Sequence, residues 1–330
     1  MSNLVTRFQL ALLEQRTIRT IIWFVATGAL LYLAAVFWFG WQEILGAFAA
    51  IGLQVLVIGA VLSSSSYLWR FGRWEYVLRV LGHAIPKFAH LGIYLSGLAL
   101  TATPGKSGET FRSALLVQHN VRVTHSLAAF LVDRGSDVLG VILLGALAAL
   151  ISGQHVTWVW ILSFVSILLI SIAFAYLLLH PLASTGWGRI GRSMTWLPIK
   201  GGQATLEAWA KVWTLPRVSV FSIIAMIAYG TQAMVFAWFC HILGTGISVA
   251  DCVFIFVQAT LFGAASMLPG GLGAMEAALV FQLLERGVSD GIAVSLAISI
   301  RLVTLWFGML LGVLSLLFLH APNPGSEDKA

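Results

Sequence analysis

Long apolar stretches separated by short polar segments make up most of this 330-residue chain. Six of them are long enough to cross a bilayer as helices, which takes about 20 residues. They predict full transmembrane spans at about 20–40, 44–68, 127–152, 156–180, 217–243 and 290–319. Two more apolar segments, 84–125 and 250–287, are interrupted near their centres. The pattern predicts an all-α polytopic membrane protein.

Each interrupted segment contains a Pro-Gly break that is followed by an acid. The first break has Pro104, Gly105, Lys106, Gly108 and Glu109, and the second has Pro269, Gly270, Gly271, Gly273 and Glu276. About nine residues separate the first acid from the polar residues 119–122, which is too few to cross about 30 Å of hydrocarbon at about 1.5 Å per residue. Both segments are therefore predicted to be re-entrant helical hairpins that enter and leave on the same side.

The two halves of the chain repeat this arrangement. Arg134 follows Glu109, and Arg301 follows Glu276, at the same spacing, and each arginine lies in the next predicted span. With the amino terminus inside, most of the 19 lysines and arginines fall on the inner side, and Arg286 falls outside. By the positive-inside rule this favours six crossings, two hairpins and cytoplasmic termini. The two hairpins then enter from opposite sides, as in inverted-repeat transporters.

These features predict one membrane domain over residues 1–330. Its first half-repeat covers about 20–152, with the hairpin at 84–125. Its second covers about 156–319, with the hairpin at 250–287. Residues 181–216 mix tryptophans with basic side chains, which is typical of a segment lying on a headgroup layer. We interpret them as a cytoplasmic interfacial insert.

Composition narrows the function classes. The chain is 59% hydrophobic and 10% charged, far from a soluble domain, of which about a quarter of the residues are charged. The net charge of +6 is carried by cations that flank membrane segments, so nucleic acid is not an expected partner. Cys240 and Cys252 have no metal-ligand spacing. Two buried free thiols are the preferred interpretation, and a disulfide between them is the alternative. No metal and no cofactor are expected.

The breaks and the intramembrane charges are the candidate site. A helix that begins after a break presents free amides and a dipole that attract anions, and Lys106 and Arg112 lie beside the first such terminus. Arg301 needs a partner, because a charge at a span centre costs about 2.5–3.5 kcal/mol, and Glu276 is the predicted one. The alternative is an ion pair that only ties hairpin to span. The predicted substrate-binding residues are Lys106, Glu109, Arg112, Arg134, Asp137, Glu276 and Arg301.

The segment Gly105-Lys106-Ser107 is similar to the end of a phosphate-binding P-loop. The full pattern needs a glycine at position 100, where this chain has Leu100, and a preceding strand. An ATP site is therefore not predicted, and ATP hydrolysis is not the expected energy source.

Together, the two Pro-Gly motifs, the acid-arginine pairs and Asp133-Arg134 with Asp137 resemble the flippase-like membrane domain of lysylphosphatidylglycerol synthases. The resemblance covers nearly the whole chain. It implies a bacterial or archaeal plasma-membrane protein that moves lipids between leaflets, or helps to move them. The aminoacyl-transferase domain of the full synthases has no counterpart here, so lysine transfer is not expected. The family often has glutamate where this chain has Asp133, and the resemblance does not identify the lipid.

The predicted function is a lipid flippase without its own ATPase, not an enzyme, in a plasma membrane, with a bacterial inner membrane preferred. Its expected partners are membrane lipids, and a homo-oligomer is compatible with the sequence. Two alternatives stay open. One is an integral-membrane transferase that acts on a lipid-linked substrate. The other is a non-transporting partner of a lipid-modifying enzyme or glycosyltransferase.

Overall fold

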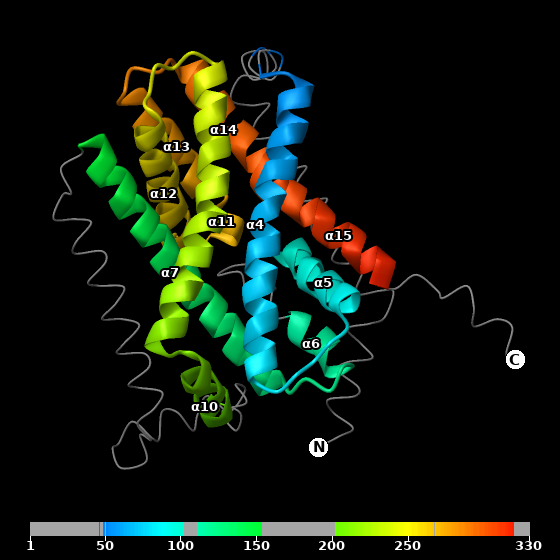
Figure 1. Cartoon of the computed structure of the whole chain (residues 1–330). Coiled ribbons are helices and arrows are strands. Elements are labelled where there is room, and N and C mark those ends of the chain that lie inside the picture. Colours follow the sequence, from blue (N-terminus) through cyan, green and yellow to red (C-terminus); the bar gives the residue numbers. More distant parts are fainter. Residues whose placement is uncertain are drawn as a thin grey trace, which may run out of the picture.

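The computed structural model describes residues 46, 49, 51–101, 111–153, 202–266 and 268–319, and these residues form helices and turns without strands. Four of the helices are long and apolar enough to span a membrane: α4 (Leu53–Val80), α7 (Val123–Ser152), α11 (Leu215–Ile242) and the continuous helix Asp290–Leu319. The last consists of α14 (Asp290–Arg301), the π-helical turn η6 (Leu302–Trp306) and α15 (Phe307–Leu319). Figure 1 shows α4, α7 and α11 side by side, with α14 and α15 crossing behind them. The predicted all-α class is confirmed for this part of the chain.

The predicted spans at 127–152, 217–243 and 290–319 match described helices to within a few residues. The prediction for 44–68 was wrong at its end, because α4 continues to Val80 and carries Arg70 and Arg73 inside the bundle. They stay in the helix because buried carboxylates neutralise them. The predicted spans at 20–40 and 156–180 lie outside the described residues.

The second interrupted segment forms two short antiparallel helices, α12 (Val249–Ala265) and α13 (Ala274–Leu284). Between them, Pro269 begins a single 3-10 turn, η5 (Pro269–Gly271). The Gln282 side chain donates to the Ile255 carbonyl at one end, and the backbones of Gly263 and Gly271 meet at the other. The connections from α11 and to α14 both lie at the upper end in Figure 1. This geometry is that of a hairpin over the predicted range 250–287.

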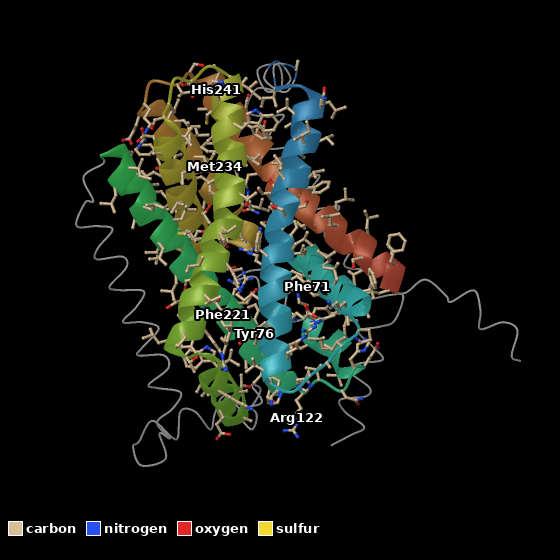
Figure 2. The ribbon with its side chains drawn as sticks, viewed as in Figure 1. Phe71, Tyr76, Arg122, Phe221, Met234 and His241 are labelled. Atoms are coloured by element: carbon tan, nitrogen blue, oxygen red, sulfur yellow. The ribbon has the colours of Figure 1, made fainter. Side chains whose placement is uncertain are left out.

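The first interrupted segment contains α5 (Lys87–Ser96), the 3-10 turn η1 (Gly97–Leu100) and α6 (Phe111–Val117). Its two ends lie together, because His83 before α5 and His125 at the start of α7 share a hydrogen bond of 2.8 Å. Both ends are at the lower end of the bundle, where Figure 2 labels Arg122, opposite His241 at the upper end of α11. The described arms of the first segment and the second hairpin therefore approach the centre from opposite ends. The break itself, with Pro104, Gly105 and Gly108, lies outside the described residues.

Two hydrophobic cores organise the bundle. The upper core joins the first turns of α4 and the last turns of α7 to α11, α12, α13 and α14, and it includes Leu56, Phe236 and Leu279. The lower core joins the last turns of α4 to α5, α6, α10 and the first turns of α7, and it includes Trp74 and Leu116. Arg70 and Arg73 on α4, and Asp133 and Asp137 on α7, fall between the stretches that enter each core.

Helix α10 (Gly202–Val212) is the described part of the predicted interfacial insert. Its Leu206, Ala208 and Val212 are buried in the bundle, and Trp213 lies where a side chain at Gly135 would collide with it. This part packs onto α7. Residues 181–201 of the insert lie outside the described ranges.

The helix α14–α15 packs tightly against both its neighbours through glycines. A side chain at Gly312 would lie 2.2 Å from the Ala99 amide nitrogen of η1, and one at Gly308 would collide with the Tyr67 hydroxyl. The Tyr67 hydroxyl donates to the Thr304 carbonyl of η6 at 2.6 Å. Small residues thus let α15 approach both α4 and the first hairpin.

Candidate functional site

Four charged side chains from α4 and α7 form an ion-pair network in the middle of the bundle. Arg70 and Arg73 are three residues apart on one face of α4, and Asp133 and Asp137 are four apart on one face of α7. Arg70 Nη2 lies 2.9 Å from Asp137 Oδ2, and Arg73 Nη2 lies 2.7 Å from Asp137 Oδ1. Arg73 Nε donates to Asp133 at 2.9 Å, and its Nη2 also contacts that carboxylate. The network joins α4 to α7 between the two cores.

Arg134 adds a third guanidinium to this network. Its Nη2 lies 3.1 Å from Asp133 Oδ2 and 3.5 Å from Asp137 Oδ2. Its side chain is 22% exposed, whereas that of Arg73 is fully buried. Arg134 is therefore the member of the network that an incoming ligand reaches most easily.

Helix α11 supports the network with polar and aromatic groups. The Tyr229 ring lies 4.5 Å from the Arg70 guanidinium carbon, and its hydroxyl donates to Asp137 at 3.4 Å. One turn along, the Gln232 amide donates to the Ser66 hydroxyl at 3.0 Å. These contacts fix the Arg70 side chain between an aromatic face and a carboxylate.

The second hairpin holds the other half of the site. Arg301 Nε donates to Glu276 Oε1 at 2.8 Å, so the predicted ion pair is present. Arg301 Nη2 also donates to the Gly270 carbonyl at 2.7 Å, and its Nη1 lies 3.4 Å from the Met275 sulfur. One side chain from α14 thus ties together both sides of the break.

Glycine is required at this break for two reasons. Gly270 and Gly271 have φ values of 61° and 66°, in the left-handed region that side chains disfavour. A side chain at Gly271 would also lie 3.1 Å from the backbone of Gly263 in α12. Gly273, with φ 81°, then precedes α13, whose first turn carries Glu276. The break therefore turns the Gly270 carbonyl toward Arg301.

A cavity of about 320 Å³ lies between the two halves of the site. From the first half it is lined by Arg70, Arg134 and Asp137, and from the second by Arg301 and the backbone of the glycine break. Polar groups from α4, α11, α12, η6 and the residue that follows η1 complete its wall: Tyr67, Tyr229, Gln232, Thr260, Thr304 and Thr101. Residues from both interrupted halves of the sequence therefore meet at one space.

The structure relocates one predicted ligand. Arg112, expected to hold phosphate beside Lys106, is buried in the lower core, where its guanidinium carbon lies 4.1 Å from the Tyr94 ring and 5.4 Å from the Trp74 ring. It is not among the described residues that line the cavity. Gly97 permits this position, because a side chain there would collide with the guanidinium. Lys106 and Glu109 lie outside the described residues.

Sequence reasoning missed Arg70, Arg73 and Tyr229. The two arginines had a detectable signal, since their spacing on α4 matches that of Asp133 and Asp137 on α7. Tyr229 had none, because it is one aromatic residue in an apolar span. Cys240 and Cys252 are both buried and free, as predicted. Within the described ranges, no three histidine, cysteine or acidic side chains gather as metal ligands would.

Comparison with known proteins agrees with this architecture. The sequence profile of the lysylphosphatidylglycerol synthase TM region matches residues 24–312. A UPF0104 membrane protein of Methanothermobacter thermautotrophicus is 24% identical over 266 residues, which cover 73% of this chain and 78% of that protein. The chain is accordingly a multi-pass membrane protein and belongs to the lysylphosphatidylglycerol synthase transmembrane-region family.

Proposed function

We propose that this protein is a flippase that moves a lipid with a phosphate-bearing headgroup between the leaflets of a plasma membrane, without its own ATPase. One observation carries the proposal: guanidinium groups from both halves of the chain line a single cavity at the centre of the bundle. Glycine-interrupted segments at matching places in two halves are the sequence pointer to such a binding site. A headgroup in this cavity would be shielded from hydrocarbon while its acyl chains stay in lipid.

The ion pairs provide a way to bind and release the headgroup. Each cavity arginine is already paired, Arg70 and Arg134 with Asp137 and Arg301 with Glu276. An entering phosphate exchanges one carboxylate partner for another anion, so no guanidinium is left bare in a medium where an unpaired charge is costly. Release restores the internal pairs. This exchange keeps bound and free states close in energy, which transport requires.

The two hairpins would then alternate around this fixed centre. Movement of one hairpin opens the cavity toward one end of the bundle, and movement of the other opens it toward the opposite end. Arg301 is placed to couple these events in the second half, because it holds Glu276 after the break and the Gly270 carbonyl within it. Loss of either contact frees the turn that closes the cavity wall.

The geometry of the same site favours lipid transport over lipid-transferase chemistry. The carboxylates Asp133, Asp137 and Glu276 all accept hydrogen bonds from guanidinium groups. A carboxylate held in this way is a poor general base, since its charge is already stabilised. The acids therefore serve better as exchangeable partners for arginine than as catalysts.

Lipid exchange in proteoliposomes tests the proposal. Purified protein is reconstituted with a fluorescent phospholipid, and dithionite added outside reports the fraction that reaches the outer leaflet. We expect Arg301→Gln and Arg134→Gln each to slow exchange by at least about tenfold, because each removes a charge-assisted contact worth about 1.5–3 kcal/mol. Glu109→Ala extends the test to the first break.

The matched control is Arg79→Gln. Arg79 lies on α4, its side chain is 56% exposed, and it pairs with Glu75 away from the cavity. This variant loses one arginine of the same helix without touching the site, so it should exchange lipid at the parental rate. Equal rates in Arg301→Gln, Arg134→Gln and Arg79→Gln would refute the transport assignment.

A further inference from the structure

The C-terminal membrane helix contacts both interrupted segments, each with a different half. Its first half, α14, packs against α13 of the second hairpin in the upper core. At the end of α14, Arg301 donates to Glu276, which follows the second break, and to the carbonyl of Gly270 within it. The position of α14 is therefore tied to that of the second hairpin.

The second half, α15, is attached to the first interrupted segment, and Figure 1 shows it beside α5. Gly312 lets α15 reach the backbone of Ala99 in η1, and the Ser315 hydroxyl donates to the Gly92 carbonyl of α5 at 2.8 Å. Leu316 is buried in the lower core with α5 and α6. A displacement of either segment is thus passed to one half of this helix, and the junction between the halves decides whether the other half follows.

The π turn η6 lies at this junction. The Phe307 amide donates to the Leu302 carbonyl, five residues earlier, whereas an α-helix would use the carbonyl four residues earlier. A π turn therefore holds one residue more than an α turn, and such turns are frequent at functional sites and at helix kinks. If the wide turn moves along the helix, each residue that it passes rotates by about 100°, the angle between successive residues of an α-helix.

Tyr67 of α4 holds the π turn in its present place. Its hydroxyl is buried and donates to the Thr304 carbonyl, inside the turn, at 2.6 Å. Gly308 follows one turn later and leaves the space that this hydroxyl occupies, because a side chain there would collide with it. The Thr304 hydroxyl donates to the Ile300 carbonyl at 2.6 Å, a bond of the kind that bends helices. Since α4 enters both hydrophobic cores, Tyr67 is a fixed point against which the two halves are set.

We propose that η6 is a joint that couples the two interrupted segments and that the Tyr67 hydroxyl sets its position. With this hydrogen bond in place, α14 and α15 keep one relative rotation, and each holds its own segment. When the hydroxyl is released, the wide turn moves by one turn toward α14. Arg301 then rotates by about 100° out of its contacts with Glu276 and Gly270, while α15 stays on the first segment. This linkage is a property of the fold, and its use in alternating the hairpins rests on the flippase assignment.

Hydrogen–deuterium exchange of the purified protein, followed by mass spectrometry, tests the joint. Tyr67→Phe keeps the ring and removes the donor. We expect the amides of 302–308 and of 268–276 to exchange about fivefold faster, which corresponds to a hydrogen bond of about 1 kcal/mol, and those of 87–101 to keep their rates. Tyr76→Phe is the control, because Tyr76 lies exposed on the same helix, and it should leave all three peptides unchanged. Faster exchange in 302–308 alone, in all three peptides or in none overturns the inference.

A deletion tests the joint independently if Tyr67→Phe does not fold. Deletion of Leu302, which is 42% exposed, removes the extra residue and leaves an α-helix whose two halves keep their rotation. This variant should fold, unfold near the parental temperature and exchange the amides of 303–308 at least about fivefold more slowly. Deletion of Leu310, which is 52% exposed in α15, has no extra residue to remove. It turns Gly312 and Ser315 away from the first segment and should lower the unfolding temperature. Equal losses in the two deletions overturn the assignment of η6 as a joint.

Lipid exchange in proteoliposomes separates this inference from the proposed function. With the joint removed, the Leu302 deletion should move a fluorescent phospholipid at least about tenfold more slowly than the parent, although it is folded. A parental rate in this folded variant overturns the part of the joint in alternating the hairpins. If the parental protein itself moves no lipid above protein-free liposomes, the flippase assignment is refuted, and the hydrogen-exchange result still decides whether η6 couples the two segments.

Discussion

The pair Arg73–Asp133 offers a direct test of whether buried charges hold α4 and α7 together. Arg73 is fully buried in α4 and contacts Asp133 through both Nε and Nη2, and the Asp133 side chain is 1% exposed. The perturbation is a double-mutant cycle of Arg73→Met, Asp133→Leu and the combined variant. Each substitution replaces a charged side chain by an apolar one that fills much of the same space.

The expected magnitudes follow from burial. Removing one partner of a buried pair costs about 3–5 kcal/mol of unfolding free energy when the other charge is left unpaired. Here Asp133 keeps Arg134 and Arg73 keeps Asp137, so each single variant should cost less than that full amount. Removing both side chains takes away one positive and one negative charge, so the net charge of the network is unchanged. The double variant should therefore cost much less than the sum of the single variants. We expect a coupling free energy of about 2–3 kcal/mol, at the upper end for residues in one network.

Reversible unfolding in mixed detergent micelles, followed by tryptophan fluorescence, measures the cycle. The same cycle on Arg79 and Glu75 is the control, because this pair also lies on α4 at 2.7 Å but is largely exposed on the arginine side. Its coupling should be about 0.3–0.5 kcal/mol. Coupling at Arg73 and Asp133 no larger than in the control would show that the network does not stabilise the fold as argued.

Two further predictions concern other parts of the bundle. Gly312→Ala should lower the unfolding free energy by about 1–3 kcal/mol, because its methyl group meets the backbone of η1 at 2.2 Å. Gly230→Ala, where the nearest atom lies at 3.9 Å, should be neutral or stabilising in the same unfolding assay, and equal losses in both would contradict the packing argument. Burial, and then the nearby Arg122, hold the pKa of His83 below its usual value of 6.5. As the pH falls, the unfolded chain therefore protonates this histidine before the folded chain does, so thermal stability should fall as the pH drops below about 6.5. His83→Gln should flatten this dependence of thermal stability on pH. An unaltered dependence would show that His83 is not responsible.

Much of the candidate site was available from sequence because local rules govern it. The Pro-Gly-Gly break required glycines, and the described turn has positive φ at Gly270 and Gly271. Arg301 had no acidic neighbour on its own helix, and the cost of a lone intramembrane charge pointed to Glu276, which is its partner. These inferences needed only spacing and the energetics of charge in lipid.

Other features followed from packing that no local pattern encodes. Arg70 and Arg73 look like cations at the end of a span, yet α4 continues through them because Asp133 and Asp137 reach them from α7. Arg112 looks like a phosphate ligand, yet its stacking on Tyr94 places it in the lower core. In each case the deciding partner lies on another helix.

The sequence by itself determined the class of the protein, the antiparallel second hairpin and the ion pair beside its break, because apolar length, glycine conformation and charge in lipid act over short stretches of chain. Only the tertiary structure decided which charges face the cavity. Ion pairing between helices depends on their relative rotation and offset, which are set by the packing of two separate cores. The same packing brings Arg70, Arg134 and Arg301 to one space.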